Sequence, residues 1–368
     1  MDCNVNVMMF GGRRCGKTSV ISAMKDCFEN VFGKDTHLVL KTEDDDTMYM
    51  LQQKRQEIEG YFANKATCMT FNCDGTDDIV DYNITASING KKGSNINFSF
   101  CDFPGEWLIR YKGREDEFKG HNERLKEKMQ DCDVIIIAVD SLYLMEKAAA
   151  ETGDSVGRYN EGRNYCATIA NMVKNNFKVS DDENPKMIMF VPIKCETYYD
   201  RGQMDLLNQR IHTGYKELFD FVQKKENRSR YEVIIAPILT FGKDTVRFSR
   251  FDHSTDGQRE LNDIEVGSET KVPNVAKFLF KNMNAKYEPE FCEQPLLYTL
   301  SYLLDLVRKT KQREKINNGW FKNLIRVVKE KYGNFASAED FLSEAELIRG
   351  KLKKNGDGYE LVNNPLGF

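Results

Sequence analysis

One eight-residue segment of this chain has residue types and spacing suited to phosphate chemistry. It reads Gly11-Gly12-Arg13-Arg14-Cys15-Gly16-Lys17-Thr18, which fits the pattern G-x-x-x-x-G-K-[ST], and Ser19 follows it. Glycines let the backbone curl around phosphate oxygens so that successive N–H groups point inward. Lys17 would reach the β and γ phosphates of a nucleotide, and Thr18 would offer its hydroxyl to Mg²⁺. The segment therefore predicts a nucleotide-binding loop.

A second motif, Asp102-Phe103-Pro104-Gly105, directly follows an apolar run at residues 96–101. Asp102 would lie at the carboxyl end of a strand, where its carboxylate could hold magnesium through water. Gly105 could give its N–H to a γ-phosphate. Alone, D-x-x-G is a common turn, but its place one hairpin after a glycine-rich loop favours the phosphate-binding interpretation.

Apolar runs around these motifs predict the elements that must position them. A strand at residues 5–10 enters the glycine loop, and helical spacing follows at 18–32. Residues 79–88 and 96–101 read as two antiparallel strands joined by a glycine-containing turn at 89–94. Further strands are expected at 134–139, 187–193 and 233–239, with helices near 160–178 and 204–225. Such alternation indicates a mostly parallel sheet, in which ligands bind at the carboxyl ends of strands.

The order of these motifs resembles that of the regulatory P-loop GTPases, the TRAFAC class that includes Ras-like proteins. The resemblance covers roughly residues 4–310 and implies guanine nucleotide (GTP or GDP) and Mg²⁺ as ligands. It also implies hydrolysis of GTP to GDP and phosphate, with residues 66–78 and 103–125 changing order between nucleotide states. The strings FVPIKCE and APILTFG are similar to an uncharacterised group of bacterial predicted GTPases, sometimes associated with conflict or defence gene clusters.

Within this resemblance, Thr76 is the residue we assign to the first switch. It lies in Gly75-Thr76-Asp77-Asp78, immediately before a strand, and would complete magnesium coordination when a γ-phosphate is bound. Thr67 and Thr70 are competing candidates. A plain turn residue at the start of a strand is the other interpretation of Thr76.

Two further positions are implied to take part in hydrolysis. Glu106 stands where Ras-like proteins place the glutamine that orients the attacking water, although its charge would sit unfavourably near a γ-phosphate. Arg13 stands where those proteins usually have glycine, and it would either stabilise charge or obstruct the site. Alternatively, Trp107 fixes the segment by packing, and Arg13 and Arg14 only add surface charge.

Base recognition is implied at Lys194 and Glu196, which follow an apolar strand where the GTPase class carries N/T-K-x-D. The lysine stem would pack over the base, and the carboxylate would accept hydrogen bonds from guanine N1–H and its exocyclic amine. Ile193 replaces the usual polar residue that secures this loop to the P-loop. The loop at Thr240-Phe241-Gly242 would line the base.

Together these patterns predict an α/β fold of the P-loop NTPase type, a three-layer sandwich whose mostly parallel sheet contains one antiparallel strand. A GTPase-like domain would span residues 1–312, with insertions near 33–74 and 242–272. Within it we expect helices at 47–64 and 295–309 and an edge strand at 275–280. Residues 313–368 would form a small helical C-terminal extension.

Composition narrows the class of protein. The formal net charge of -4 gives no basis for a nucleic-acid partner, and no apolar run is long enough to span a bilayer. Ten scattered cysteines without a secretion signal are expected to be reduced thiols. We therefore expect a soluble, cytoplasmic protein.

Three functions remain open at this point. The first is a Mg²⁺-dependent GTPase switch with slow hydrolysis, acting on an unknown protein effector or under an unknown regulator, with a homodimer also open. The second is an ATPase or a small-molecule kinase that shares the P-loop. The third is a scaffold that binds nucleotide without hydrolysing it and presents residues 313–368 to a partner.

Overall fold

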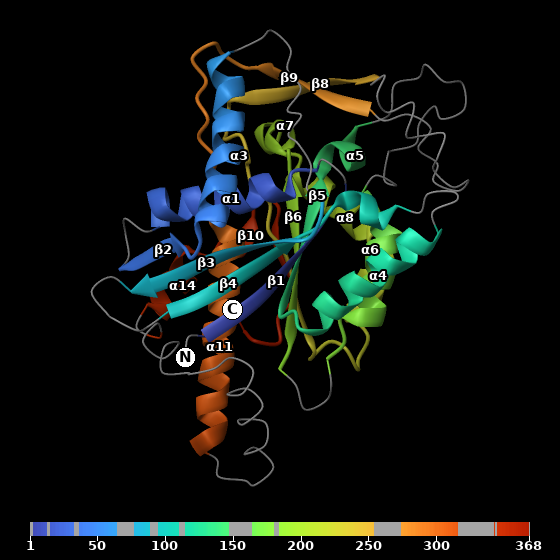
Figure 1. Cartoon of the computed structure of the whole chain (residues 1–368), viewed down its shortest axis with the longest axis vertical. Coiled ribbons are helices and arrows are strands. Elements are labelled where there is room, and N and C mark those ends of the chain that lie inside the picture. Colours follow the sequence, from blue (N-terminus) through green and yellow to red (C-terminus); the bar gives the residue numbers. More distant parts are fainter. Residues whose placement is uncertain are drawn as a thin grey trace.

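A computed structural model, shown in Figure 1, describes most of the chain. The described residues are 3–12, 15–32, 37–64, 77–88, 95–109, 115–146, 164–179, 184–253, 274–315, 342 and 344–367. Arg13, Arg14, Thr76 and the two competing threonines at 67 and 70 lie outside these ranges. The turn at 89–94 and residues 316–341 of the expected C-terminal extension lie outside them too.

Nine strands form one sheet in the order β10-β11-β7-β6-β5-β1-β4-β3-β2. Their bounds are β1 Cys3–Phe10, β2 Leu38–Thr42, β3 Val80–Ile88, β4 Asn95–Asp102, β5 Val134–Asp140, β6 Lys186–Ile193, β7 Tyr231–Ile235, β10 Asn355–Gly356 and β11 Tyr359–Asn363. A separate two-stranded sheet pairs β8 (Val246–His253) with β9 (Asn274–Phe280). Strands at all the predicted apolar runs are therefore present, although β7 ends earlier than expected.

The central block of the sheet is parallel, and an antiparallel strand borders it on each side. β1 pairs in parallel with β4 and β5, and β5-β6-β7 continue in the same direction. β3 runs against β4, and β11 runs against β7. The expectation of one antiparallel strand is therefore wrong, because the C-terminal segment returns to the sheet and adds a second.

Ten helices have bounds as follows in the described chain: α1 Lys17–Cys27, α3 Asp45–Ala63, α4 Glu115–Gln130, α5 Ser141–Met145, α6 Cys166–Asn176, α7 Glu196–Asp200, α8 Met204–Gly214, α9 Lys216–Val222, α11 Gln294–Lys315 and α14 Ala345–Lys351. A short π-helix spans Phe28–Phe32, and a 3₁₀ turn, η2, spans Gly105–Leu108. The helix expected over 204–225 is two helices, α8 and α9.

Helices cover both faces of the sheet, which makes three layers (Figure 1). Alternate side chains of β1 enter two different cores: Met9 belongs to the core that includes residues of α1, α11 and α14, whereas Met8 belongs to the core that includes residues of α4, α6 and α8. All residues of β5 are buried, as expected for a parallel strand covered on both faces. The predicted three-layer arrangement is present.

The two expected insertions contain regular structure. Residues 33–74 include β2, which pairs with β3, and the helix α3, whose N-terminus is capped by Asp44. The range 242–272 holds the strand β8, in which Phe248 and Phe251 interrupt charged residues. Residues 275–280 do not form an edge strand of the main sheet, because β9 pairs with β8 instead.

The C-terminal segment differs from the expected helical extension. The helix α11 continues to Lys315, across the expected boundary at 312. Beyond it α14 is helical, but β10 and β11 are strands, and β11 pairs with β7 of the main sheet. The prediction of helix is therefore wrong for residues 355–363, because unpaired edge groups of β7 supply hydrogen-bond partners that local sequence does not reveal.

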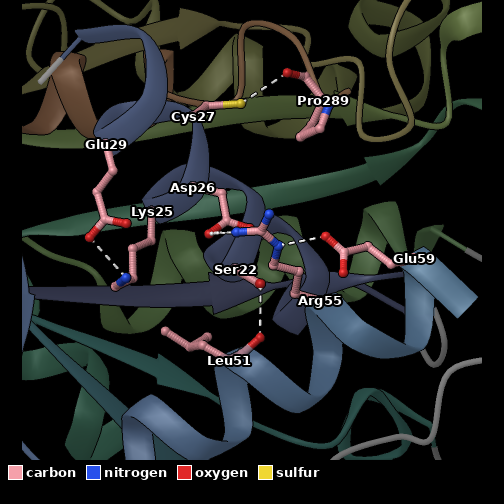
Figure 2. A network of polar contacts seen from close by, with 9 residues as sticks. All are labelled: Ser22, Lys25, Asp26, Cys27, Glu29, Leu51, Arg55, Glu59 and Pro289. Atoms are coloured by element: carbon pink, nitrogen blue, oxygen red, sulfur yellow. Dashed lines mark hydrogen bonds and ion pairs between the residues drawn. The ribbon is translucent and has the colours of Figure 1, made fainter. Parts of the chain in front are cut away.

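A polar network ties α1, the helix that follows the glycine loop, to α3 (Figure 2). The Ser22 hydroxyl donates to the carbonyl oxygen of Leu51 at 3.1 Å. The Arg55 guanidinium lies 3.2 Å from Asp26 and 2.8 Å from Glu59. These contacts fix the helix whose N-terminus faces the candidate site.

Candidate nucleotide-binding site

The glycine loop lies between β1 and α1, as predicted. A Cβ on Gly11 would lie 2.7 Å from the Cys15 sulfur and 3.1 Å from the Ala138 carbonyl oxygen, so no side chain fits there. Gly16 caps α1 in the left-handed conformation, with φ of 109°, which glycine adopts readily. The Cys15 N–H donates to the Gly12 carbonyl at 3.2 Å. Ser19 is buried in the first turn of α1.

Lys17 lies over this loop and faces the end of β4. Its ammonium is 3.5 Å from the Gly11 carbonyl oxygen and 3.6 Å from Asp102 Oδ1. It also lies 5.7 Å from the centre of the Phe103 ring. Burial is the largest single effect on Lys17 and lowers its pKa, but the charges of Asp102, Cys15 and Glu106 and the hydrogen bond to Asp102 together raise the pKa, so the ammonium stays charged.

Thr18 and Asp102 meet although 84 positions separate them in the chain. The Thr18 hydroxyl donates to Asp102 Oδ2 at 2.7 Å, and the Asp102 side chain is only 1% exposed. Parallel pairing of β1 with β4 sets Met9 opposite Asp102 and so delivers the carboxylate beside the loop. Mg²⁺ prefers oxygen ligands, and this hydroxyl and carboxylate supply them. The pair therefore fits the predicted metal site.

Tyr82 of β3 is a neighbour of this pair that the sequence analysis did not single out. Burial raises the pKa of the Tyr82 phenol to about 12, and the charge of Asp102 contributes in the same direction. The phenol therefore lies within electrostatic reach of the Asp102 carboxylate. In sequence, the only signal for Tyr82 was its place on the strand that precedes the strand leading into D-x-x-G.

Gly105 and Glu106 begin the 3₁₀ turn η2, next to the cradle. The Trp107 N–H donates to the Pro104 carbonyl at 3.0 Å, which closes this turn. Glu106 is half-buried, and its negative charge helps to raise the pKa of Lys17. Trp107 packs as the alternative interpretation expected, because its ring is buried against neighbouring side chains.

Lys194 follows β6 and reaches back toward β5. Its ammonium lies 2.6 Å from Asp140 Oδ2, and its backbone has φ of 54°, which is uncommon for a residue with a side chain. Ile193 Cδ1 would lie 3.7 Å from a Cβ on Gly16, so an apolar side chain joins this loop to the cradle. Asp140 was missed by the sequence analysis, although a carboxylate that ends the run VIIIAV was a usable signal.

Glu196 joins the two predicted base loops. Its side chain is 2% exposed, and Oε1 accepts the Phe241 N–H at 2.9 Å. Burial raises the pKa of Glu196 to about 7, against the lowering effect of that hydrogen bond. One carboxylate oxygen therefore holds the loop at residues 240–242.

The residues of that loop point in different directions. The Phe241 ring packs against Phe278 of β9, with centres 5.7 Å apart. Thr240 has a buried hydroxyl that makes no hydrogen bond within the described part of the chain. Gly242 has φ of 94°, and a Cβ there would lie 2.1 Å from the Glu288 carbonyl oxygen.

The structure thus brings together Lys17, Thr18 and Asp102, with Glu106 close by. Lys194 and Glu196 follow the carboxyl end of β6, which lies beyond β5 from β1, and each is held by a protein partner. The roles of Arg13, Arg14 and Thr76 stay predictions, since these residues lie outside the described ranges.

Comparison with known proteins is limited. No family model matches the chain, and no curated protein matches it. One similar solved structure is that of Era in complex with MgGDPNP and nucleotides 1506-1542 of 16S ribosomal RNA, at 14% identity and a TM-score of 0.33. The match covers 65% of this chain but only 52% of the Era chain. A likeness this weak carries no argument about family, ligand or partner, so the expectation of no nucleic-acid partner also stays a prediction.

Among the described residues, no helix is both long and apolar enough to cross a bilayer.

Proposed function

We propose that this protein is a Mg²⁺-dependent guanine-nucleotide-binding switch that hydrolyses GTP slowly. The observation that carries the proposal is the position of the Asp102 carboxylate at the end of β4, 3.6 Å from the Lys17 ammonium and 2.7 Å from the Thr18 hydroxyl. A backbone cradle, a cation and a metal-binding oxygen pair are the parts that phosphoryl transfer requires. The strand order supports the proposal, because β1 lies between β4 and β5 and open α/β sheets bind ligands at the carboxyl ends of such strands.

Each residue has a defined task in this proposal. The backbone of the glycine loop and Lys17 hold the phosphates, and the Gly105 N–H donates a hydrogen bond to the γ-phosphate. Thr18 and Asp102 hold Mg²⁺, which neutralises phosphate charge when bound. Glu106 orients water, and its own negative charge beside the γ-phosphate is the reason we expect hydrolysis to be slow.

The base is proposed to lie between Lys194 and the loop at residues 240–242. Lys194 is held in place by Asp140, and its aliphatic stem supports one face of the base. Glu196 supplies the carboxylate for guanine. It also fixes the Phe241 backbone, so the two loops that surround the base are joined.

A second candidate, an ATPase or another P-loop phosphotransferase, is favoured by the same contact. Guanine recognition of the expected kind needs a carboxylate that accepts from two nitrogen atoms of the base. In this structure Oε1 of Glu196 already accepts the Phe241 N–H, and the side chain is buried. A protein that discriminates less strictly between guanine and adenine fits this arrangement.

Nucleotide titration tests the proposal directly. Fluorescent GDP and ADP analogues are titrated into purified protein with and without Mg²⁺, and phosphate release from GTP and ATP is measured. We expect tighter guanine binding, Mg²⁺ dependence, and turnover that disappears in Lys17→Ala. Lys25→Ala, which removes a surface ion pair with Glu29 of the π-helix that follows α1, is the matched control and should keep both properties.

The other outcomes identify the alternatives. Tighter adenine binding would favour the ATPase or phosphotransferase. Guanine binding without any phosphate release would favour a nucleotide-stabilised scaffold. The titrations do not address four parts of the proposal, which are a protein effector, a regulator, a second copy of this chain and a bacterial defence setting. Partner-capture experiments address these.

A further inference from the structure

The ring of Trp107, one residue after Glu106, is held by two side chains of α4. His121 stacks on it with ring centres 4.2 Å apart and planes 2° from parallel. The Arg124 guanidinium lies 4.7 Å from the ring centre. His121 and Arg124 are three positions apart, so one face of α4 supplies both contacts.

Arg124 also contacts the segment that leads into β3. Its guanidinium donates to Asp78 Oδ1 at 2.9 Å. The same oxygen accepts the N–H of Ile79 at 2.7 Å, which holds the carboxylate in place. Asp78 lies two positions after the proposed switch residue Thr76.

Trp107 is connected in the other direction to the phosphate cradle. The Trp107 and Phe103 rings have centres 6.5 Å apart, and Phe103 packs edge-on against Phe10 at 5.2 Å. Phe103 in turn lies beneath the Lys17 ammonium. Side chains in contact therefore connect Asp78 to Lys17 through Arg124 and two aromatic rings.

We propose that Arg124 is a positioning residue that makes the segment before β3 and the turn carrying Glu106 move as one unit. The inference rests on the proposed function, because both segments are those expected to respond to the γ-phosphate. An exposed ion pair alone contributes little, since solvent screens it. The same guanidinium over a largely buried indole adds a cation–π contact, so one side chain serves both segments.

A second ion pair supplies a matched control. Lys128, one helical turn after Arg124, lies 2.7 Å from Asp81 and so joins α4 to β3, next to the segment that Arg124 contacts. Among the described residues it has no cation–π contact with Trp107. If Arg124 acted only by fastening α4 to β3, loss of Lys128 would have the same effect.

The test uses Trp107 as its own reporter. The chain has two tryptophans, so all variants carry Trp320→Phe. Arg124→Gln, Asp78→Asn, Lys128→Gln and Asp81→Asn are compared for the fluorescence difference between GDP and a non-hydrolysable GTP analogue, for phosphate release, and for the dissociation constant of a fluorescent GDP analogue. Thermal melts show that each variant is folded.

We expect Arg124→Gln to reduce both the fluorescence difference and phosphate release by about five-fold, with little change in GDP affinity. Asp78→Asn should reproduce part of this loss and add nothing further to Arg124→Gln. Lys128→Gln and Asp81→Asn should stay within about two-fold of the parent.

Three results would overturn the inference. Equal losses in the Arg124 and Lys128 variants would show a general tether. Unchanged fluorescence and turnover in a folded Arg124→Gln that binds GDP would remove Arg124 from the switch while leaving the proposed function intact. A parent protein that binds no guanine nucleotide would defeat the proposed function itself, and the inference with it.

Discussion

The ammonium of Lys194 and the carboxylate of Asp140 form an ion pair 2.6 Å long at the ends of two neighbouring parallel strands. The other Asp140 oxygen accepts the Leu142 N–H at 3.1 Å, and Asn164 hydrogen-bonds the Asp140 backbone on both sides. These hydrogen bonds hold Asp140 in place independently of its ion pair with Lys194. Strained backbone such as that of Lys194 persists where its surroundings hold it and is common at functional sites.

Asp140→Asn should weaken nucleotide binding through Lys194. Without the carboxylate, the Lys194 ammonium is left buried without its charge partner, and its stem is free to leave the base. We expect guanine-nucleotide affinity to fall about ten-fold and stability to fall by about 3 kcal/mol. Titration with a fluorescent GDP analogue and urea unfolding measure the two effects.

A double-mutant cycle with Lys194→Met separates positioning from general damage. If Asp140 acts through Lys194, Asp140→Asn should add little to the affinity loss of Lys194→Met. Fully additive losses would mean that Asp140 supports the site by another route.

Thr18→Ala should weaken the response to Mg²⁺ more than the binding of nucleotide. The variant removes the hydroxyl that lies 2.7 Å from Asp102 Oδ2 but leaves the backbone cradle and Lys17. We expect the Mg²⁺ concentration for half-maximal phosphate release to rise at least about ten-fold. Ser22→Ala, one turn later in α1, loses its bond to the Leu51 carbonyl and should change stability only, so an equal Mg²⁺ shift there would refute the assignment of Thr18.

Glu196→Gln should reduce the preference for guanine without unfolding the loop. The amide oxygen still accepts the Phe241 N–H, so stability should change by less than about 1 kcal/mol. The amide nitrogen replaces an acceptor with a donor, so the ratio of guanine to adenine affinity should fall about ten-fold. An unchanged ratio would limit Glu196 to holding Phe241, while Glu196→Ala should destabilise the loop in either case.

The local motifs were predictable because each depends on a few adjacent residues. Glycines at 11 and 16, Lys17 and Thr18 have their predicted strand and helix on either side, and Asp102 ends its strand as expected. Parallel strands follow from runs of buried apolar residues, of which β5 is the clearest. The meeting of the motifs at the ends of β1 and β4 was also predictable, since the carboxyl ends of parallel strands lie at one edge of the sheet.

Long-range partners were not predictable in this way. Lys194 was singled out for the base, but its partner Asp140 lies 54 positions earlier and looks like an ordinary helix cap in sequence. β11 is a short strand between β10 and β7, and most of its residues are half-buried, so its sequence has no apolar run that would predict a strand. Its pairing depends on β7. Arg124 lies on an exposed face of α4, where charge normally indicates only contact with solvent.

Gly242→Ala should be strongly destabilising because neither the backbone nor the space allows a side chain. Its φ is 94°, and the added Cβ would lie 2.1 Å from the Glu288 carbonyl oxygen. We expect a loss of about 3 kcal/mol in urea unfolding. Gly202→Ala is the control, since Gly202 has φ of 64° with no atom within 4 Å, and should cost only about 1 kcal/mol for the left-handed backbone. Equal costs would show that the Glu288 backbone moves aside freely.

Glu232 of β7 should make stability fall as the pH rises. Its side chain is fully buried, and Oε2 accepts the Leu366 N–H at 2.9 Å. Burial raises the pKa of Glu232 from 4.5 to about 8. At a pH between these two pKa values, the Glu232 carboxyl is ionised in the unfolded chain but protonated in the folded chain. The stability linked to this proton is therefore complete below the lower pKa and is lost as the pH rises through the higher pKa.

Glu232→Gln removes this titration while keeping an acceptor for Leu366. Wild-type protein should lose on the order of 3 kcal/mol more than the variant between about pH 5.5 and about pH 9. Urea unfolding of both proteins at several pH values measures the difference, which cancels the other titrating groups that they share. Parallel stability curves for the two proteins would mean that Glu232 is ionised in the fold and finds a compensating charge, for which Lys309 is the nearest source.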